Sequence, residues 1–184
     1  MEKQLTKKQL RKKILDQRKS LTKSEWQTKS DRICHQLQSF SLFNQTKTIL
    51  AYFSIRQEPD LSPLFSINKK WGFSRCVNQL LVWHSWQLGE QLQPGLYNIQ
   101  EPLINAPLIQ PQEVDLILVP TVACDRQKYR LGYGGGFYDR MLSDKQWHNK
   151  TTIGIVFDFA YLAQLPIDSW DIKLDYVCTE TAIY

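Results

Sequence analysis

The sequence predicts an α/β fold in layers, with helices packed on a mostly parallel sheet. Stretches with helical spacing of apolar residues alternate with short apolar runs that are typical of buried strands. A cluster of glycines follows one of these runs and precedes a possible helix start at Phe137. The chain has 184 residues, and without an evident linker or internal repeat we expect a single domain over residues 1–184.

Two helices are predicted at the start of the chain. Residues Thr6 to Gln9 match a capping box, and apolar residues follow at helical spacing. A second capping box runs from Thr22 to Glu25 and predicts a helix that extends to about Gln38.

Strands and helices then alternate. Strands are predicted at residues 48–54, 71–77, 79–86, 115–122, 151–157 and 176–179. A helix is predicted from Asp60 to Lys69, with Asp60 as its cap and Pro63 in its first turn. Residues 89–111 contain four prolines and are expected to form an ordered loop beside the site.

Charge and cysteine content narrow the class of protein. Residues 1–32 carry eleven Lys or Arg and four Asp or Glu, so the net charge of +5 comes from the leading segment. No apolar run approaches the ~20 residues of a membrane span, and no signal core is evident. The four cysteines have no zinc-ligand spacing. We therefore expect reduced thiols and a cytoplasmic protein without a membrane partner.

The segment from Arg130 to Arg140 is the most informative one for function. Four of the eight glycines fall within residues 132–136, between a predicted strand and a predicted helix. Glycines let backbone N–H groups approach a phosphate, and a helix N-terminus favours negative charge. A tight strand-to-helix turn is the alternative, but such a turn needs fewer glycines.

Three groups of residues are also candidates for chemistry. Lys7 and Arg11 are four residues apart, so they share a helix face on which they can clamp a polyphosphate, lie in solvent or bind nucleic acid. Glu58 lies beyond a predicted strand, where α/β sheets place ligands, although a solvated glutamate is the alternative. Asp139 and Asp171 are candidate Mg²⁺ ligands; caps or surface acids are the alternative for them.

Several motifs together resemble the 5-formyltetrahydrofolate cyclo-ligase family, also called methenyltetrahydrofolate synthetases. The most specific is the stretch RLGYGGGFYDR at residues 130–140, which follows LVPTVACD at residues 118–125. Weaker matches occur in the family's order, at residues 7–11, 53–58, 95–102 and 171–175.

This resemblance implies a fold and a reaction. The fold is a three-layer α/β sandwich related to ribose-5-phosphate isomerase and CoA-transferase-like folds. The reaction is the ATP-dependent conversion of 5-formyltetrahydrofolate to 5,10-methenyltetrahydrofolate, with release of ADP and phosphate. Phosphorylation of the formyl oxygen makes phosphate the leaving group when N10 closes the ring. The implied enzyme is a cytoplasmic monomer that uses Mg²⁺ and does not bind nucleic acid.

The resemblance also implies roles for individual positions. The implied ATP-binding residues are Lys7, Arg11, Arg130, Leu131, Gly132, Tyr133, Gly134, Gly135, Gly136, Phe137 and Tyr138. The implied folate-binding residues are Phe53, Glu58, Tyr97, Tyr133 and Phe137. Arg130 and Tyr133 are the implied catalytic residues. Asp139 and Asp171 match the metal ligands, and the sequence leaves open whether Asp175 replaces Asp171.

Two other hypotheses remain open at this point. A nucleotide- or RNA-binding module would use the basic first helix, and its binding to oligonucleotides would depend steeply on salt. An ATP-dependent enzyme with the same fold would act on another substrate, because fold does not fix function.

Overall fold

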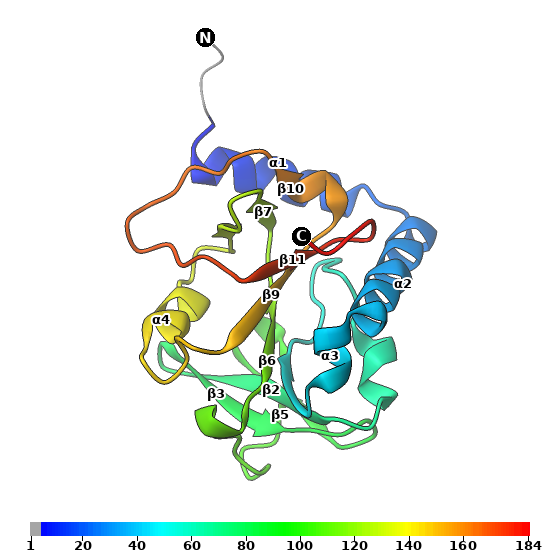
Figure 1. The fold of residues 1–184 in the computed structure, drawn as a ribbon, viewed down its shortest axis with the longest axis vertical. Helices are drawn as coiled ribbons and strands as arrows, with labels where there is room; N and C mark the ends of the chain where they lie inside the picture. Colours follow the sequence, from blue (N-terminus) through cyan, green and yellow to red (C-terminus); the bar gives the residue numbers. More distant parts are fainter. Residues whose placement is uncertain (1–4) are drawn as a thin grey trace.

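A six-stranded sheet in the order β11-β9-β6-β1-β2-β3 forms the centre of the computed structural model, which describes residues 5–184 (Figure 1). The strands are β1 (Thr48–Ala51), β2 (Lys70–Val77), β3 (Leu80–Ser85), β6 (Leu116–Pro120), β9 (Thr151–Ile155) and β11 (Tyr176–Cys178). Every neighbouring pair is parallel except β2 and β3, which form an antiparallel hairpin. The predicted α/β class with a mostly parallel sheet is confirmed.

Side chains of the central strands alternate between two cores, one on each face of the sheet. In β6, Leu116 and Leu118 belong to one core, while Ile117 and Val119 belong to the other. Because both faces are covered, these strands are apolar throughout rather than alternating with polar residues. Their continuous apolar runs were therefore a sound basis for predicting buried strands.

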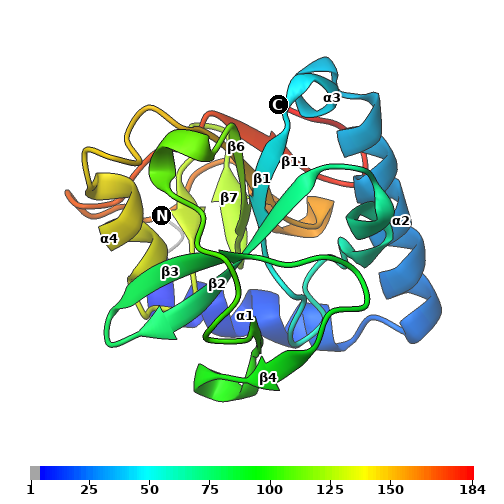
Figure 2. The same cartoon turned by 90° about the horizontal axis from the view of Figure 1, so that it is seen from below.

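Helices cover both faces, which gives the molecule three layers (Figure 2). On one face lie α2 (Lys23–Ser39), α3 (Ser41–Gln45) and the 3₁₀ turn η1 (Ser62–Ser66). The other face is covered by α1 (Lys7–Lys19) and α4 (Phe137–Ser143). Both predicted capping boxes are present, at Thr6 and Thr22, so the two N-terminal helices begin where the sequence indicates.

A second, three-stranded sheet in the order β10-β7-β8 was not predicted. Its strands are β7 (Ala123–Asp125), β8 (Arg130–Leu131) and β10 (Tyr161–Leu162). The buried Asp125 carboxylate accepts hydrogen bonds from the backbone N–H groups of Gln127, Tyr129 and Leu165, which fixes the turn before β8. The glycine loop therefore follows β8, and not the long buried strand as the sequence suggested.

Two other predictions need correction. The helix expected from Asp60 to Lys69 is only η1, and its N-cap is Leu61 rather than Asp60, because its apolar residues are held by the core rather than by helical periodicity. The Asp60 carboxylate accepts from the Ser62 backbone N–H just before this turn. The expected loop at 89–111 contains a small hairpin. It consists of β4 (Leu92–Pro94), η2 (Leu96–Asn98) and β5 (Gln100–Pro102). Further 3₁₀ turns are η3 (Pro111–Glu113) and η4 (Asp158–Ala160).

The cysteine side chains and the lengths of the apolar helices can also be read from the structure. All four cysteines have free thiols, and only Cys76 is not fully buried. Burial raises the pKa of the Cys34 thiol to about 12, as expected for an unreactive core residue. Within residues 5–184, no helix has the length and apolar character that crossing a membrane requires.

Candidate active site

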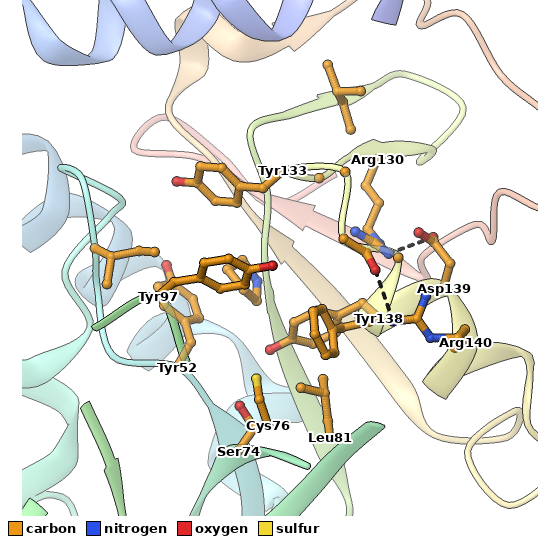
Figure 3. A pocket seen from close by; sticks show the side chains of 18 of the residues that line it. Tyr52, Ser74, Cys76, Leu81, Tyr97, Arg130, Tyr133, Tyr138, Asp139 and Arg140 are labelled. Atoms are coloured by element: carbon orange, nitrogen blue, oxygen red, sulfur yellow. Dashed lines mark hydrogen bonds and ion pairs between the residues drawn. The ribbon is translucent and has the colours of Figure 1, made fainter. Parts of the chain in front are cut away.

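A cavity of about 1010 Å³ lies beyond the carboxyl ends of β1 and β6. Helix α1, the turn after β1, the β2–β3 hairpin, the β4–β5 hairpin, the glycine loop and residues 168–172 surround it. Every site residue predicted from the sequence lines this one cavity. Figure 3 shows the side chains of Tyr97, Tyr133 and Tyr138 around the same space.

The glycine loop joins β8 to α4 at one end of the cavity. Gly134 and Gly136 have φ angles of +104° and +67°, in the left-handed region that favours glycine. The Arg11 side chain donates from Nε to the Gly132 carbonyl oxygen at 2.7 Å, so α1 holds the loop in place. The glycine conformations and the Arg11 anchor together indicate a preformed loop.

Arg130 lies at the base of this loop and pairs with Asp139. Its Nη2 is 2.6 Å from Asp139 Oδ1 (Figure 3), and its guanidinium lies 5.6 Å from the Tyr138 ring centre. Arg130 Nε is buried and has no partner among the described residues. A buried donor without an acceptor is costly, so an anionic ligand at this position would satisfy it.

Lys7 connects α1 to the segment before β11. Its ammonium group lies 2.7 Å from Asp168 Oδ2 and also contacts Asp171 Oδ2. Burial lowers the pKa of Lys7, but hydrogen bonds and charge from Asp168 and Asp171 outweigh it, so the net pKa is raised. Lys7 is thus a fixed cation at the cavity wall.

The two predicted metal ligands line the same cavity, each beside a cation. Asp139 pairs with Arg130 and Asp171 pairs with Lys7. Asp175 does not line the cavity. Its carboxylate accepts hydrogen bonds from the backbone N–H and the hydroxyl group of Thr152, both at 2.8 Å. Residues 5–184 contain no group of three or more His, Cys, Asp or Glu side chains arranged to hold a metal ion.

The opposite end of the cavity is aromatic and contains a buried carboxyl group. Phe53 stacks on Phe73 with ring centres 4.1 Å apart. Glu58 is only 2% exposed and accepts from the Ile55 backbone N–H at 3.1 Å. Burial raises the pKa of Glu58 to about 7, although the charge of Arg18 opposes this. The alternative of a solvated surface glutamate is therefore wrong.

Tyr97 lies across the cavity on the β4–β5 hairpin. It is 68% exposed and has a φ angle of +58°, an uncommon conformation for a bulky residue. The hairpin is anchored by the buried Glu101, which accepts from the Cys76 backbone N–H at 2.9 Å. A side chain at Gly95 would meet the Glu101 carboxyl carbon at 2.0 Å, so any larger residue there would displace the buried Glu101 carboxyl group.

Sequence reasoning missed Arg18. Its side chain is buried and donates to the Tyr133 hydroxyl at 2.7 Å and to the Thr121 carbonyl oxygen at 3.0 Å. A signal for it existed, because Arg18 recurs at helical spacing after Arg11 and Ile14 on the inner face of α1. The basic residues on this face point into the protein and are not a solvated stripe.

The family model described as the 5-formyltetrahydrofolate cyclo-ligase family matches residues 3–180. The chain is 28% identical to 5-formyltetrahydrofolate cyclo-ligase of Escherichia coli (strain K12), over 93% of this chain and 98% of the relative. The corresponding protein of Haemophilus influenzae is 30% identical over 71% of this chain and 74% of its own length.

Solved structures agree with this assignment. The NMR structure of Aquifex aeolicus 5,10-methenyltetrahydrofolate synthetase superposes with a TM-score of 0.87 at 32% identity, and the match covers 97% of this chain and 92% of the other. The Mycoplasma pneumoniae 5,10-methenyltetrahydrofolate synthetase shares the fold, with a TM-score of 0.76 at 22% identity over 96% of this chain and 99% of the other. From the family match and the shared fold, we conclude that this chain belongs to the 5-formyltetrahydrofolate cyclo-ligase family.

Proposed function

We propose that this chain catalyses the ATP-dependent cyclisation of 5-formyltetrahydrofolate to 5,10-methenyltetrahydrofolate, with release of ADP and phosphate. The observation that carries the proposal is the division of one cavity into two unlike ends. A glycine loop with basic side chains occupies one end, and an aromatic wall with a buried carboxyl group occupies the other. Tyr133 belongs to the loop and also reaches Glu58.

The glycine-loop end suits the ATP phosphates. Its backbone is held open by left-handed glycines, and Lys7 and Arg11 approach it from α1. The unpartnered Nε of Arg130 supplies a buried donor beside the loop. Fixed cations and N–H groups stabilise the charge on a transferring phosphoryl group without needing to reorganise during the reaction.

The aromatic end suits the pterin ring of the folate. Phe53 offers a flat apolar surface, and the Glu58 carboxyl group can accept hydrogen bonds from the ring's N–H donors. Tyr97 closes the opposite side, and Phe137 lies at the border with the nucleotide end. Hydrogen bonds from a bound folate would offset the cost of burying a carboxyl group at this position.

The chemistry follows from placing the two substrates side by side. The formyl oxygen of 5-formyltetrahydrofolate attacks the γ-phosphorus of ATP, and ADP leaves. N10 then attacks the activated formyl carbon, loses its proton, and phosphate departs as the methenyl bridge forms. We assign Arg130 to stabilising the phosphoryl charge and Tyr133 to hydrogen bonding between the loop and Glu58.

The donor set at the nucleotide end is compatible with Mg²⁺. Mg²⁺ typically takes one or two carboxylates, with the remaining ligands coming from substrate phosphates and water. Asp139 and Asp171 both line the cavity and would hold the ion, and Arg130 and Lys7 orient these carboxylates. When bound with ATP, the ion would supply charge neutralisation at the phosphates.

The decisive experiment is a spectroscopic assay of the purified protein. We expect a methenyl chromophore to appear, in step with ADP release, only when 5-formyltetrahydrofolate, ATP and Mg²⁺ are all present. ADP release with another acceptor and no chromophore would instead favour an enzyme with a different substrate on the same fold. Action as a single-domain monomer in the cytoplasm, without nucleic acid, remains a prediction from the sequence.

A further inference from the structure

We infer that Arg18 is a positioning residue of this active site, whose buried guanidinium fixes the Tyr133 hydroxyl group in the cavity that Glu58 also lines. This inference rests on the proposed function, because it assigns Glu58 to the folate. Arg18 itself does not line the cavity. It lies one layer behind the wall, and it acts on the substrate only through Tyr133 and Glu58.

The contacts of Arg18 carry the inference. Its residue exposure is 2%, and burying a guanidinium group is expensive unless its donors and its charge are compensated. Nη2 donates to the Thr121 carbonyl oxygen, just past the end of β6, and Nη1 donates to the Tyr133 hydroxyl oxygen. No carboxylate within residues 5–184 forms an ion pair with Arg18.

Tyr133 lies between Arg18 and the cavity, and its hydroxyl group accepts a hydrogen bond from Arg18. Since the phenol oxygen accepts from Arg18, its own hydrogen is free to be donated, and the Glu58 carboxyl group is an acceptor in the same cavity. The cation, the hydroxyl group and the carboxyl group therefore form one polar cluster. In a low-dielectric interior the members of such a cluster polarise one another.

Arg18 also affects the ionisation of Glu58 through its charge. The groups that face Glu58 are Arg18 on α1, Arg56 in its own turn, Tyr52 after β1, and Tyr133 and Tyr138 on the glycine-loop side. Burial raises the pKa of Glu58, and Arg18 is the largest of the influences that lower it. Arg18 therefore keeps a larger fraction of Glu58 ionised and able to accept from a folate N–H.

The position of Arg18 also connects the two ends of the cavity. Helix α1 carries Lys7 and Arg11 at the nucleotide end and Arg18 behind the folate end. Tyr133 belongs to the loop assigned to ATP, yet Arg18 holds its hydroxyl group in the cavity that Glu58 lines at the folate end. One rigid helix thus sets the geometry of both subsites.

The test compares Arg18→Met, which removes the charge, with Arg18→Lys, which keeps it. Binding of 5-formyltetrahydrofolate is titrated calorimetrically without ATP, from about pH 6 to about pH 9. We expect Arg18→Met to bind roughly tenfold more weakly at about pH 6 and nearly normally at about pH 9, as for a pKa raised by about one unit. Arg18→Lys should restore most of the wild-type pH profile.

Lys19→Met is the matched control, because it removes an exposed charge from the same helix. It should leave binding unchanged at every pH. A loss of binding that is equal at all pH values, or equal in Arg18→Met and Arg18→Lys, would show that Arg18 is only structural. If Arg18→Met does not fold, Tyr133→Phe must produce the same upward shift of the profile, and an unshifted profile overturns the inference.

Unfolding experiments separate this inference from the proposed function. The free energy of unfolding should fall with rising pH until Glu58 is ionised in the folded state, and Arg18→Met should extend that fall by about one pH unit. If the wild-type protein does not bind folate, the proposed function fails, while the unfolding profiles still decide the role of Arg18. Identical profiles in the wild type and Arg18→Met would refute it.

Discussion

Replacement of Glu58 by Gln should stabilise the protein at alkaline pH. Glu58 is 2% exposed, and its carboxyl group accepts a hydrogen bond from the Ile55 backbone N–H. A glutamine oxygen can accept the same bond with nearly the same shape, but it carries no charge to desolvate. The substitution therefore isolates the cost of burying the carboxylate at the folate end of the cavity.

The magnitude follows from the pKa. Burial raises the pKa of Glu58 from 4.5 to about 7, so the folded state holds this proton more tightly than the unfolded state. Between these two values the unfolded state loses its proton first, and the free energy of unfolding falls as pH rises. A pKa difference of about 2.5 corresponds to a loss of about 3 kcal/mol in the free energy of unfolding. The whole of this loss has occurred once the pH is above the folded-state pKa.

Urea unfolding at about pH 5 and about pH 8 measures this effect, and most of the pKa interval lies between those values. Between the two conditions, the wild-type protein should lose roughly 2–3 kcal/mol more stability than Glu58→Gln. Asp16→Asn, an exposed substitution on α1, should follow the wild type within about 0.5 kcal/mol. Parallel losses in the wild type and Glu58→Gln would refute the argument that burial dominates the environment of Glu58.

Four substitutions, Glu58→Gln among them, test the site by enzyme kinetics. Arg130→Ala or Asp139→Asn should each lower turnover by about two orders of magnitude, because charge stabilisation at the phosphates is lost; wild-type rates of methenyl formation, with circular dichroism showing a folded protein, would contradict these roles. Glu58→Gln should raise KM for 5-formyltetrahydrofolate more than KM for ATP, and an unchanged folate KM would remove Glu58 from that subsite. Gly134→Ala should raise KM for ATP and reduce stability by about 1 kcal/mol, because its φ angle of +104° strains any residue with a Cβ; a neutral result in steady-state kinetics and thermal unfolding would show that the loop tolerates another conformation.

Features that depend on residues close together in the sequence were predictable. The capping boxes at Thr6 and Thr22 are closed within four residues of chain, so the starts of α1 and α2 could be read directly. The same is true of the glycine loop, where left-handed φ angles at Gly134 and Gly136 are a backbone requirement. Residues 60–69 were predicted wrongly as a helix. A capping-type residue followed by apolar side chains occurs both at the start of helices and in short turns that pack against a core, so the local pattern could not distinguish the two.

The placement of distant residues depended on tertiary structure. Lys7 and Asp171 are 164 residues apart and meet because α1 crosses the end of the sheet near the segment before β11. Sequence spacing alone did not show whether Asp171 or Asp175 is the candidate metal ligand. In the folded protein the Asp175 carboxylate accepts a hydrogen bond from Thr152 instead. The β7–β8–β10 sheet likewise arises from pairing between strands that have no strong local signal.

The sequence by itself determined the layered α/β class, the N-terminal helices and the glycine loop, because periodicity, caps and glycine conformations are local properties of the chain. Tertiary structure decided that Glu58 is buried, that Arg18 supports it through Tyr133, and that Arg130 keeps an unpartnered donor. Burial and electrostatic environment are sums over neighbours brought together by the fold, and a linear pattern contains no record of them.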